Sequence, residues 1–401
     1  MTDIAEHSDI FWKTASTIPF KQYETTASFE TVVQKLLPQI ILPEELKLIR
    51  LAFNDKLSQK DTDDFLQNWD IERYGAHGAL LLSYIQKKFP ELDFHEYTGP
   101  RLAGLFNYYR FRNLELISQY KKIVEKLNES NIIPVIMKGG ALKYLRPELP
   151  RIMGDIDILI PDNIQFEKAK QIILSLGYEQ FCDAGHSIDF HKSGDKNNGV
   201  LDMHRRIDEL MENYELLNQN IISRAAKQKV FQTQSFVPCA EDLVFISLFH
   251  LAKNMLEGTC IKNFMYTIFD MEFFTSKPDF NWQIILQNAK DGKCRKNIYL
   301  AIIFINALLP NSVPDSLKKE LIDDEKVLRE LDKDYFYARF VHKVKYARKK
   351  ISFLSTLSDR KKFTPYVGSK IKYIFTKRIY NSDRLLKIVF SWRKKIKSWN
   401  I

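Results

Sequence analysis

The chain of 401 residues has few of the residues that build cross-linked or repetitive scaffolds. Its four cysteines, Cys182, Cys239, Cys260 and Cys294, form no CxxC pair, which argues against a disulfide framework and against a structural zinc site. With 14 glycines and 14 prolines, the sequence is neither collagen-like nor linker-like. Apolar residues make up 45% and charged residues 27%, so we expect a folded, helix-rich protein.

Long hydrophobic runs are also missing. The longest apolar run, Ile298 to Leu309, is interrupted by Asn306 and is shorter than the ~20 residues of a membrane-spanning helix, so we expect a buried core helix there. The residues Met1 to Glu6 are acidic and lack the basic and apolar segments of a secretory signal. We therefore expect a cytoplasmic protein.

Acidic residues are scarce in only one part of the chain. The formal net charge is +10, yet residues 339–401 carry 19 lysines and arginines against two acids, a net of +17, which leaves −7 for residues 1–338. Such an asymmetry is typical of a polyanion contact, and 11 aromatic residues are interleaved with these basic ones. This basic tail could stack on RNA, lie on an anionic membrane surface at the inner face, or simply pack its aromatic side chains on the body.

Changes in hydrophobic periodicity divide the chain into five segments. A helical period is followed near Asn131 by strand, helix, strand and helix patterns, and the helical period returns near Asp208. The fold class that we predict is α+β, with a small mixed-sheet α/β core embedded in helical N- and C-terminal regions. The predicted segments are an N-terminal segment, a helical region, the core, a second helical region and the basic tail, at residues 1–28, 29–128, 129–207, 208–338 and 339–401.

Within the core, short apolar runs and turn residues predict the individual elements. They are a buried strand over 132–137, a second strand over 155–160, a helix over 164–176 with Gly177 at its C-terminus, and a hairpin formed by 187–191 and 199–204.

Two acidic residues alternate with apolar ones in the second predicted strand. Asp155 and Asp157 are expected on one face, while Ile156 and Ile158 point into the core. Neighbouring carboxylates repel each other unless a cation lies between them. Magnesium is the expected ion, because it binds one or two carboxylates together with substrate phosphates. Asp202 has apolar neighbours in a later predicted strand, which favours it as a third ligand.

A glycine pair marks the turn after the first predicted strand. Gly139 and Gly140 come where this strand turns into a helix, so backbone N–H groups at a helix N-terminus are available to an anion. A triphosphate fits such a place.

Together these residues resemble the nucleotidyltransferase fold shared with DNA polymerase β and, within it, the bacterial group of uncharacterised nucleotidyltransferases. The motifs that carry the resemblance lie within about residues 131–206, and the wider likeness, which includes the flanking helical regions, extends over residues 29–275. Its motifs are Lys138-Gly139-Gly140, Arg151 four residues before Asp155-Ile156-Asp157, Leu176-Gly177-Tyr178 and Leu201-Asp202-Met203-His204.

The resemblance implies two-metal nucleotidyl transfer, with two Mg²⁺ ions held by Asp155, Asp157 and Asp202 and an NTP as substrate. It also implies that Asp202 promotes deprotonation of the acceptor. Lys138 and Arg151 are then candidates for phosphate contact beside Gly139 and Gly140. His204, on the same strand face as Asp202, is a candidate for substrate contact.

Each candidate also has a simpler structural interpretation. Asp155 and Asp157 could be solvated at a strand edge, and the glycines could serve only the turn. Lys138 and Arg151 could be salt-bridge partners of the carboxylates, and His204 could be a packed or solvated histidine.

The resulting prediction is a Mg²⁺-dependent nucleotidyltransferase that transfers an NMP from an NTP to a hydroxyl or phosphate. The group's place in surface-polysaccharide or natural-product assembly suggests a small-molecule or lipid-linked acceptor. Two alternatives stay open: an enzyme that nucleotidylates RNA or protein and uses the basic tail, and a non-catalytic nucleotide-binding module with the same fold.

Overall fold

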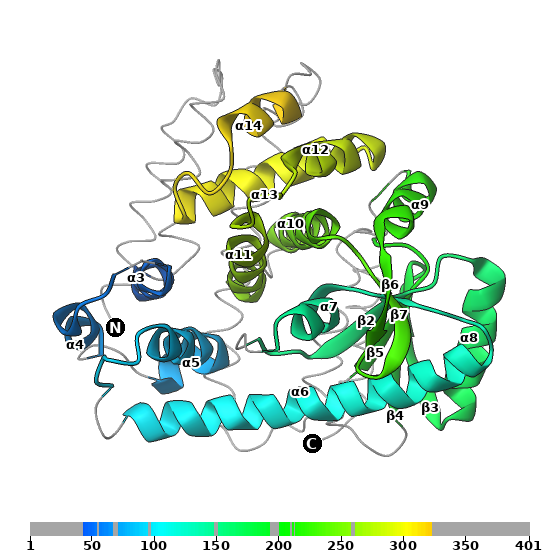
Figure 1. Ribbon diagram of the computed structural model, residues 1–401, viewed down its shortest axis with the longest axis horizontal. Coiled ribbons are helices and arrows are strands. Elements are labelled where there is room, and N and C mark those ends of the chain that lie inside the picture. Colours follow the sequence, from blue (N-terminus) through cyan, green and yellow to red (C-terminus); the bar gives the residue numbers. More distant parts are fainter. Residues whose placement is uncertain are drawn as a thin grey trace, which may run out of the picture. The chain divides into compact units, whose positions relative to one another are not determined.

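The computed structural model describes residues 43–53, 56–66, 71–94, 98–147, 151–192, 200–208, 211, 213–257 and 261–322 (Figure 1). The predicted N-terminal segment, 1–28, and the predicted basic tail, 339–401, lie outside these ranges.

The described strands form one mixed sheet in the order β3-β4-β5-β2-β1-β7-β6. The pairs β2/β5 and β1/β7 are parallel, and the other neighbouring pairs are antiparallel. The strands are β1 (Val135–Ile136), β2 (Asp155–Leu159), β3 (Tyr178–Asp183), β4 (Ser187–Lys192), β5 (Val200–His204), β6 (Ala226–Val230) and β7 (Thr233–Val237).

Helices precede, interrupt and follow this sheet in the described ranges. They are α3 (Pro43–Ala52), α4 (Gln59–Leu66), α5 (Ile71–Lys88), α6 (Thr98–Glu129), α7 (Lys138–Leu145), α8 (Asn163–Ser175), α9 (Tyr214–Arg224), α10 (Ala240–Glu257), α11 (Ile261–Thr275), α12 (Trp282–Asp291), α13 (Arg295–Leu308) and α14 (Asp315–Ile322). The α+β fold class is thereby confirmed.

One face of the sheet is apolar and covered by helices. The long helix α6 contacts β2, β7 and α8, and Figure 1 shows it running along the sheet. Ile156 and Ile158 on β2 are buried with their partners across the strand pairing, Leu201 and Met203 on β5. Because side chains alternate along a strand, the acidic residues of β2 and β5 lie on the opposite face.

The strands and helix predicted for the core are present, and the structure adds three strands. The predicted hairpin is β4/β5, and α8 ends at Ser175, followed by the C-cap Leu176 and by Gly177, which adopts a left-handed conformation with φ of +82°. Strand β3 was not predicted, and the hairpin β6/β7 lies in a segment for which we expected only helices.

The apolar run near residue 300 forms the buried helix α13, as predicted. Its side chains from Ile298 to Ile305 are buried, and it packs against α12, α14 and α3. No described helix is both long and apolar enough to cross a membrane.

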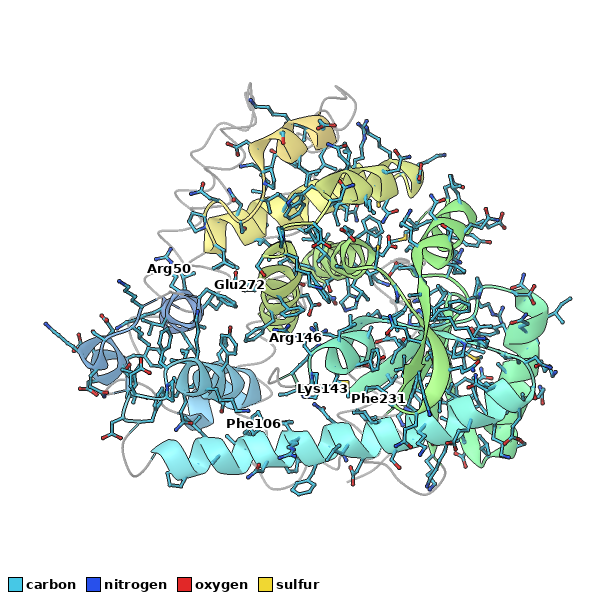
Figure 2. The ribbon with its side chains drawn as sticks, viewed as in Figure 1. Arg50, Phe106, Lys143, Arg146, Phe231 and Glu272 are labelled. Carbon is cyan, nitrogen blue, oxygen red and sulfur yellow. The ribbon has the colours of Figure 1, made fainter. Side chains whose placement is uncertain are left out.

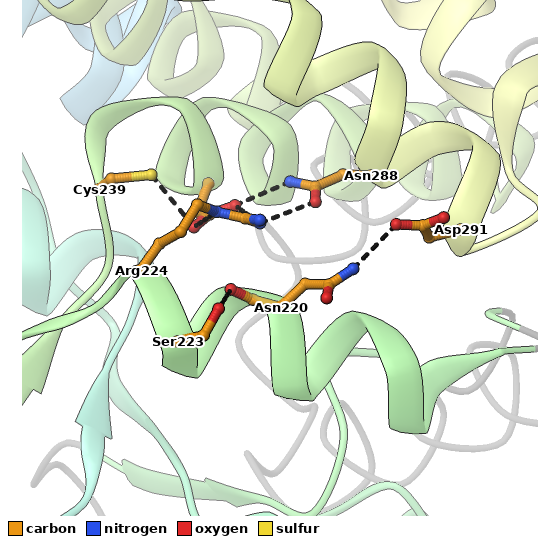
Figure 3. A network of polar contacts seen from close by, with 7 residues as sticks. Asn220, Ser223, Arg224, Cys239, Asn288 and Asp291 are labelled. Carbon is orange, nitrogen blue, oxygen red and sulfur yellow. Dashed lines mark hydrogen bonds and ion pairs between the residues drawn. The ribbon is translucent and has the colours of Figure 1, made fainter.

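A buried polar network joins α9, α10 and α12 (Figure 3). Arg224 on α9 donates from Nε and Nη2 to the two carboxylate oxygens of Asp242 on α10, at 3.0 and 2.7 Å. Asn288 Nδ2 on α12 and the Cys239 thiol donate to the same carboxylate, at 2.7 and 3.1 Å. Burial raises the pKa of Cys239 to about 12, so the thiol keeps the proton that it donates. Asp242 is fully buried, and these four donors compensate for its lost hydration.

Candidate active site

Strand pairing brings two of the predicted aspartates together. In the parallel pair β2/β5, Asp157 lies directly opposite Asp202. Asp157 is only 3% exposed, whereas Asp155, at the beginning of β2, is exposed. The isoleucine that separates them is buried, as the alternation predicted. Asp157 is therefore not a solvated residue at a strand edge.

Two basic side chains contact these carboxylates. Lys138 Nζ lies 2.5 Å from Asp157 Oδ1. His204 Nε2 lies 3.1 Å from Asp157 Oδ1 and 2.9 Å from Asp202 Oδ2. His204 is 2% exposed. Ligand-type atoms of Asp157, Asp202 and His204 all lie within 4.8 Å of one another, so these three residues could hold a metal ion.

The pKa values reflect burial and the mutual charges of this cluster. Burial alone would raise the pKa of both Asp157 and Asp202, but Lys138 holds the first below its usual value and His204 holds the second below its usual value. Burial disfavours the charged imidazole, yet the Asp202 carboxylate raises the pKa of His204 to about 9. Reduced hydration and the charge of Asp157 raise the pKa of Asp155 to about 7. In this cluster the only positive charges near the three carboxyl groups are thus those of two described side chains, Lys138 and His204.

One carboxylate oxygen in the cluster has unused hydrogen-bonding capacity. Asp202 Oδ1 is buried and has no hydrogen-bond partner among the described residues, although Ser187 donates to the same carboxylate. A buried carboxylate oxygen without a donor is costly, and a cation at this position would remove that cost. The residues present therefore fit a divalent ion.

The glycine turn adopts a different backbone from the one that its composition suggests. Lys138, the first residue of α7, takes the left-handed conformation with φ of 44°, and neither Gly139 nor Gly140 has a positive φ. Gly140 serves close packing instead: a Cβ on it would lie 3.0 Å from Ile136 Cδ1. Met137, the N-cap residue, provides no side-chain cap. The first N–H groups of α7 thus receive no hydrogen bond from the N-cap side chain, and the phosphate contact expected there stays a prediction.

Arg151 lies beside the glycine turn and pairs with a residue outside the predicted site. Its guanidinium contacts the buried carboxylate of Asp270 on α11, to which Ser247 also donates a hydrogen bond. A Cβ on Gly139 would lie 3.4 Å from Arg151 Nε, so the guanidinium borders the N-terminus of α7. Asn113 on α6 bonds the backbone of this loop on both sides, through Arg151 O and Met153 N.

A second contact joins α7 to α11. Figure 2 labels Arg146 between these two helices, and its guanidinium carbon lies 3.6 Å from the centre of the Phe273 ring. Helix α7 is therefore held from its C-terminus as well as through the loop that carries Arg151.

Strand β4 contributes two residues that were not among our candidates. Ser187 lies opposite His204 and Asp189 lies opposite Asp202 across the β4/β5 pairing, so both share the acidic face. The predicted hairpin register contained this information, because Ser187, Asp189 and His191 alternate with the apolar residues of that strand.

Carboxylates on adjacent strands of a mixed sheet, together with a helix that begins in a glycine turn, are the arrangement that the sequence predicted for a nucleotidyltransferase, and the comparison with family profiles shows that this protein is one. The sequence profile of the family described as uncharacterised nucleotidyltransferase matches residues 79–310, more than half of the chain, and the chain belongs to that family.

Two solved structures align with most of their own length. The antibiotic-resistance factor ANT(2'')-Ia is 10% identical, with 61% of this chain and 97% of that chain covered at a TM-score of 0.26. A protein of H. pylori assigned as a nucleotidyltransferase is 16% identical, with 58% and 96% covered at a TM-score of 0.25. Neither alignment is close enough to bear on substrate or mechanism. No curated protein matches the chain.

Proposed function

We propose that this nucleotidyltransferase moves a nucleoside monophosphate from an NTP to a hydroxyl or phosphate of an acceptor, with Mg²⁺ as cofactor. The observation that carries this proposal is the pair Asp157 and Asp202: they lie opposite each other, Asp157 is buried, and one buried carboxylate oxygen of Asp202 lacks a donor. Such a pair beside an anion-accepting helix N-terminus suits a substrate that is a metal-bound triphosphate.

In this proposal Asp155, Asp157 and Asp202 hold two Mg²⁺ ions. When bound, the ions would neutralise charge on the triphosphate and favour departure of pyrophosphate. Asp202, on β5 directly beside the central strand β2, takes the proton of the acceptor hydroxyl.

The phosphates would lie against the first turn of α7. The N–H groups of Gly139 and Gly140 donate to phosphate oxygens, and Lys138 and Arg151 supply positive charge from either side. The sequence also predicted a substrate contact for His204. Its burial between the aspartates supports a role on the carboxylates instead.

We propose a small-molecule or lipid-linked acceptor, and a cytoplasmic protein that can lie at the inner membrane face. The basic tail keeps RNA as a second candidate acceptor, because 19 basic residues and 11 aromatics would bind a single strand. RNA binding that weakens steeply with salt and disappears when residues 339–401 are deleted would favour RNA. Pelleting of the full-length chain, but not of the truncated chain, with anionic vesicles would favour the membrane.

The test of the core proposal compares NTP binding and pyrophosphate release, with Mg²⁺ and each labelled NTP in turn. Asp157→Asn and Asp202→Asn should abolish Mg²⁺-dependent binding, whereas Asp279→Asn, an exposed aspartate before α12, should leave it unchanged. Absence of NTP binding in the wild-type protein, or equal binding in all four proteins, would overturn the proposal.

A further inference from the structure

We infer that His204 Nε2 is itself a metal ligand, so that the ion between Asp157 and Asp202 has one nitrogen and two carboxylate ligands and is Mn²⁺ in preference to Mg²⁺. This inference rests on the proposed function, because it concerns one of the two ions proposed there.

The spacing of the three atoms suits a metal ion. An octahedral ion with ligands at about 2.1 Å places neighbouring ligand atoms about 3.0 Å apart. The distances from His204 Nε2 to Asp202 Oδ2 and to Asp157 Oδ1 are 2.9 and 3.1 Å. Both strands already fix the two carboxylates through their pairing, so the main movement that an ion requires is the displacement of the Lys138 ammonium, 2.5 Å from Asp157 Oδ1.

Hydrogen bonding alone satisfies this cluster incompletely. Nε2 carries a single proton and faces two carboxylates, while Asp202 Oδ1 has no partner within the described part of the chain. An ion that takes the place of that proton would interact with all of these groups at once, and the proton would leave to solvent. Because His204 is buried, no water replaces the missing contacts from its own side.

The nitrogen ligand determines which ion is preferred. Imidazole suits transition ions such as Zn²⁺, Fe²⁺ and Ni²⁺, and Mg²⁺ prefers oxygen ligands; Mn²⁺ shares those oxygen ligands and, as a first-row transition ion, tolerates one imidazole better than Mg²⁺ does. The exposed Asp155, together with the shared carboxylate of Asp157 and the triphosphate, offers oxygen ligands alone. The two proposed ions would therefore differ: a nitrogen-ligated ion held by the protein, and a Mg²⁺ ion that arrives with the nucleotide.

The test is electron spin-echo spectroscopy of Mn²⁺ bound to the full-length protein, with Mn²⁺ alone and with Mn²⁺ plus inorganic triphosphate. Coordinated histidine gives a ¹⁴N modulation, which should change when the wild-type protein is prepared with ¹⁵N-labelled histidine. His204→Gln should lose the modulation and lower the Mn²⁺-over-Mg²⁺ preference about 10- to 100-fold. His186→Gln, which alters the ring beside His204 at 5.8 Å, should keep both.

Three outcomes are decisive. A ¹⁴N signal that follows the histidine label and is lost only in His204→Gln supports the inference. Mn²⁺ binding that requires Asp157 but shows no histidine nitrogen overturns it and leaves the proposed function intact. Absence of any Mn²⁺ or Mg²⁺ binding overturns both. The isotope comparison uses wild-type protein alone, so the absence of a histidine nitrogen overturns the inference even where His204→Gln does not fold, and a signal that persists in His186→Gln then supports it.

Discussion

Two clusters of charged residues, one around Asp242 and one around Asp157, are built from similar groups but differ in how well their carboxylates are satisfied by hydrogen bonds and ion pairs. Around Asp242, one carboxylate receives four donors from three neighbouring residues, and both its oxygens are used (Figure 3). Around Asp157, three carboxyl groups share Lys138 and His204, and one oxygen has no described partner. The first cluster is complete without a ligand, and the second is not. A surplus of acceptors, more than burial or charge, therefore distinguishes the candidate site from a structural network.

The largest contrast is expected in folding stability. Asp242→Asn should lower the free energy of unfolding by roughly 3 kcal/mol, because the partly buried Arg224 loses its charged partner. Asp157→Asn should cost much less, since it leaves two carboxyl groups facing two cations. Urea titration of both variants measures the difference. Equal losses would mean that the Asp157 cluster is also structural. Asp291→Asn, which alters a bond from Asn220 in the same helices, should cost only about 1 kcal/mol.

The next contrast concerns the two glycines of the turn. Gly140→Ala should destabilise the fold by about 1–3 kcal/mol, because the added Cβ would lie 3.0–3.2 Å from the side chains of Ile136 and Ile156. In Gly139→Ala the nearest atom is 3.4 Å away, so thermal unfolding should change little. Nucleotide affinity should nevertheless fall, since the Cβ would stand beside the proposed phosphate position. An unchanged nucleotide affinity in Gly139→Ala would remove this turn from the site.

The next prediction decides whether Arg151 contacts the nucleotide or has only a structural role. Asp270→Asn should mainly lower stability, because it leaves the guanidinium buried without its carboxylate. Arg151→Met should in addition raise the KM for NTP about tenfold, the loss expected for one charged phosphate contact. Steady-state kinetics and thermal unfolding of the two variants separate these effects. A normal KM in Arg151→Met would make the residue purely structural.

The smallest effect is expected at Lys138, whose ammonium group competes with a cation. Lys138→Met should strengthen binding of Mn²⁺ in the absence of nucleotide by up to about tenfold, since one repelling charge is removed. The same variant should weaken NTP binding. Calorimetric titration of metal and of NTP measures the two changes, and parallel weakening of both would contradict the competition.

The central strands could be predicted from the sequence because polar and apolar residues alternate along them, which indicates which side of each strand is buried. Asp155, Asp157 and Asp202 stand out against apolar neighbours, and strand pairing then brings Asp157 and Asp202 together. The strands that we missed lie toward the two edges of the sheet. Most residues of β3 and β6 are exposed and polar, as edge strands usually are, and β7 points Thr233 and Ser235 inward in place of apolar residues.

Contacts between distant residues could be predicted only in part. The sequence offered Lys138 as a salt-bridge partner of the carboxylates, and it contacts Asp157. Nothing local in the sequence indicates that Arg151 pairs with Asp270, 119 residues later, because this pairing depends on where helix α11 packs against the loop before β2. The left-handed backbone at Lys138 could not be predicted either. Two glycines follow this residue, and glycine is the residue that usually adopts such a conformation.

The ammonium group of Lys138 has one more consequence. Since a tethered cation already neutralises Asp157, the most buried carboxylate of the candidate site, we expect the protein to fold without inorganic ions. Treatment with a chelator should therefore abolish catalytic activity and leave the midpoint of thermal unfolding unchanged. Under the proposed function, the folded protein would then await only ions and nucleotide to become active.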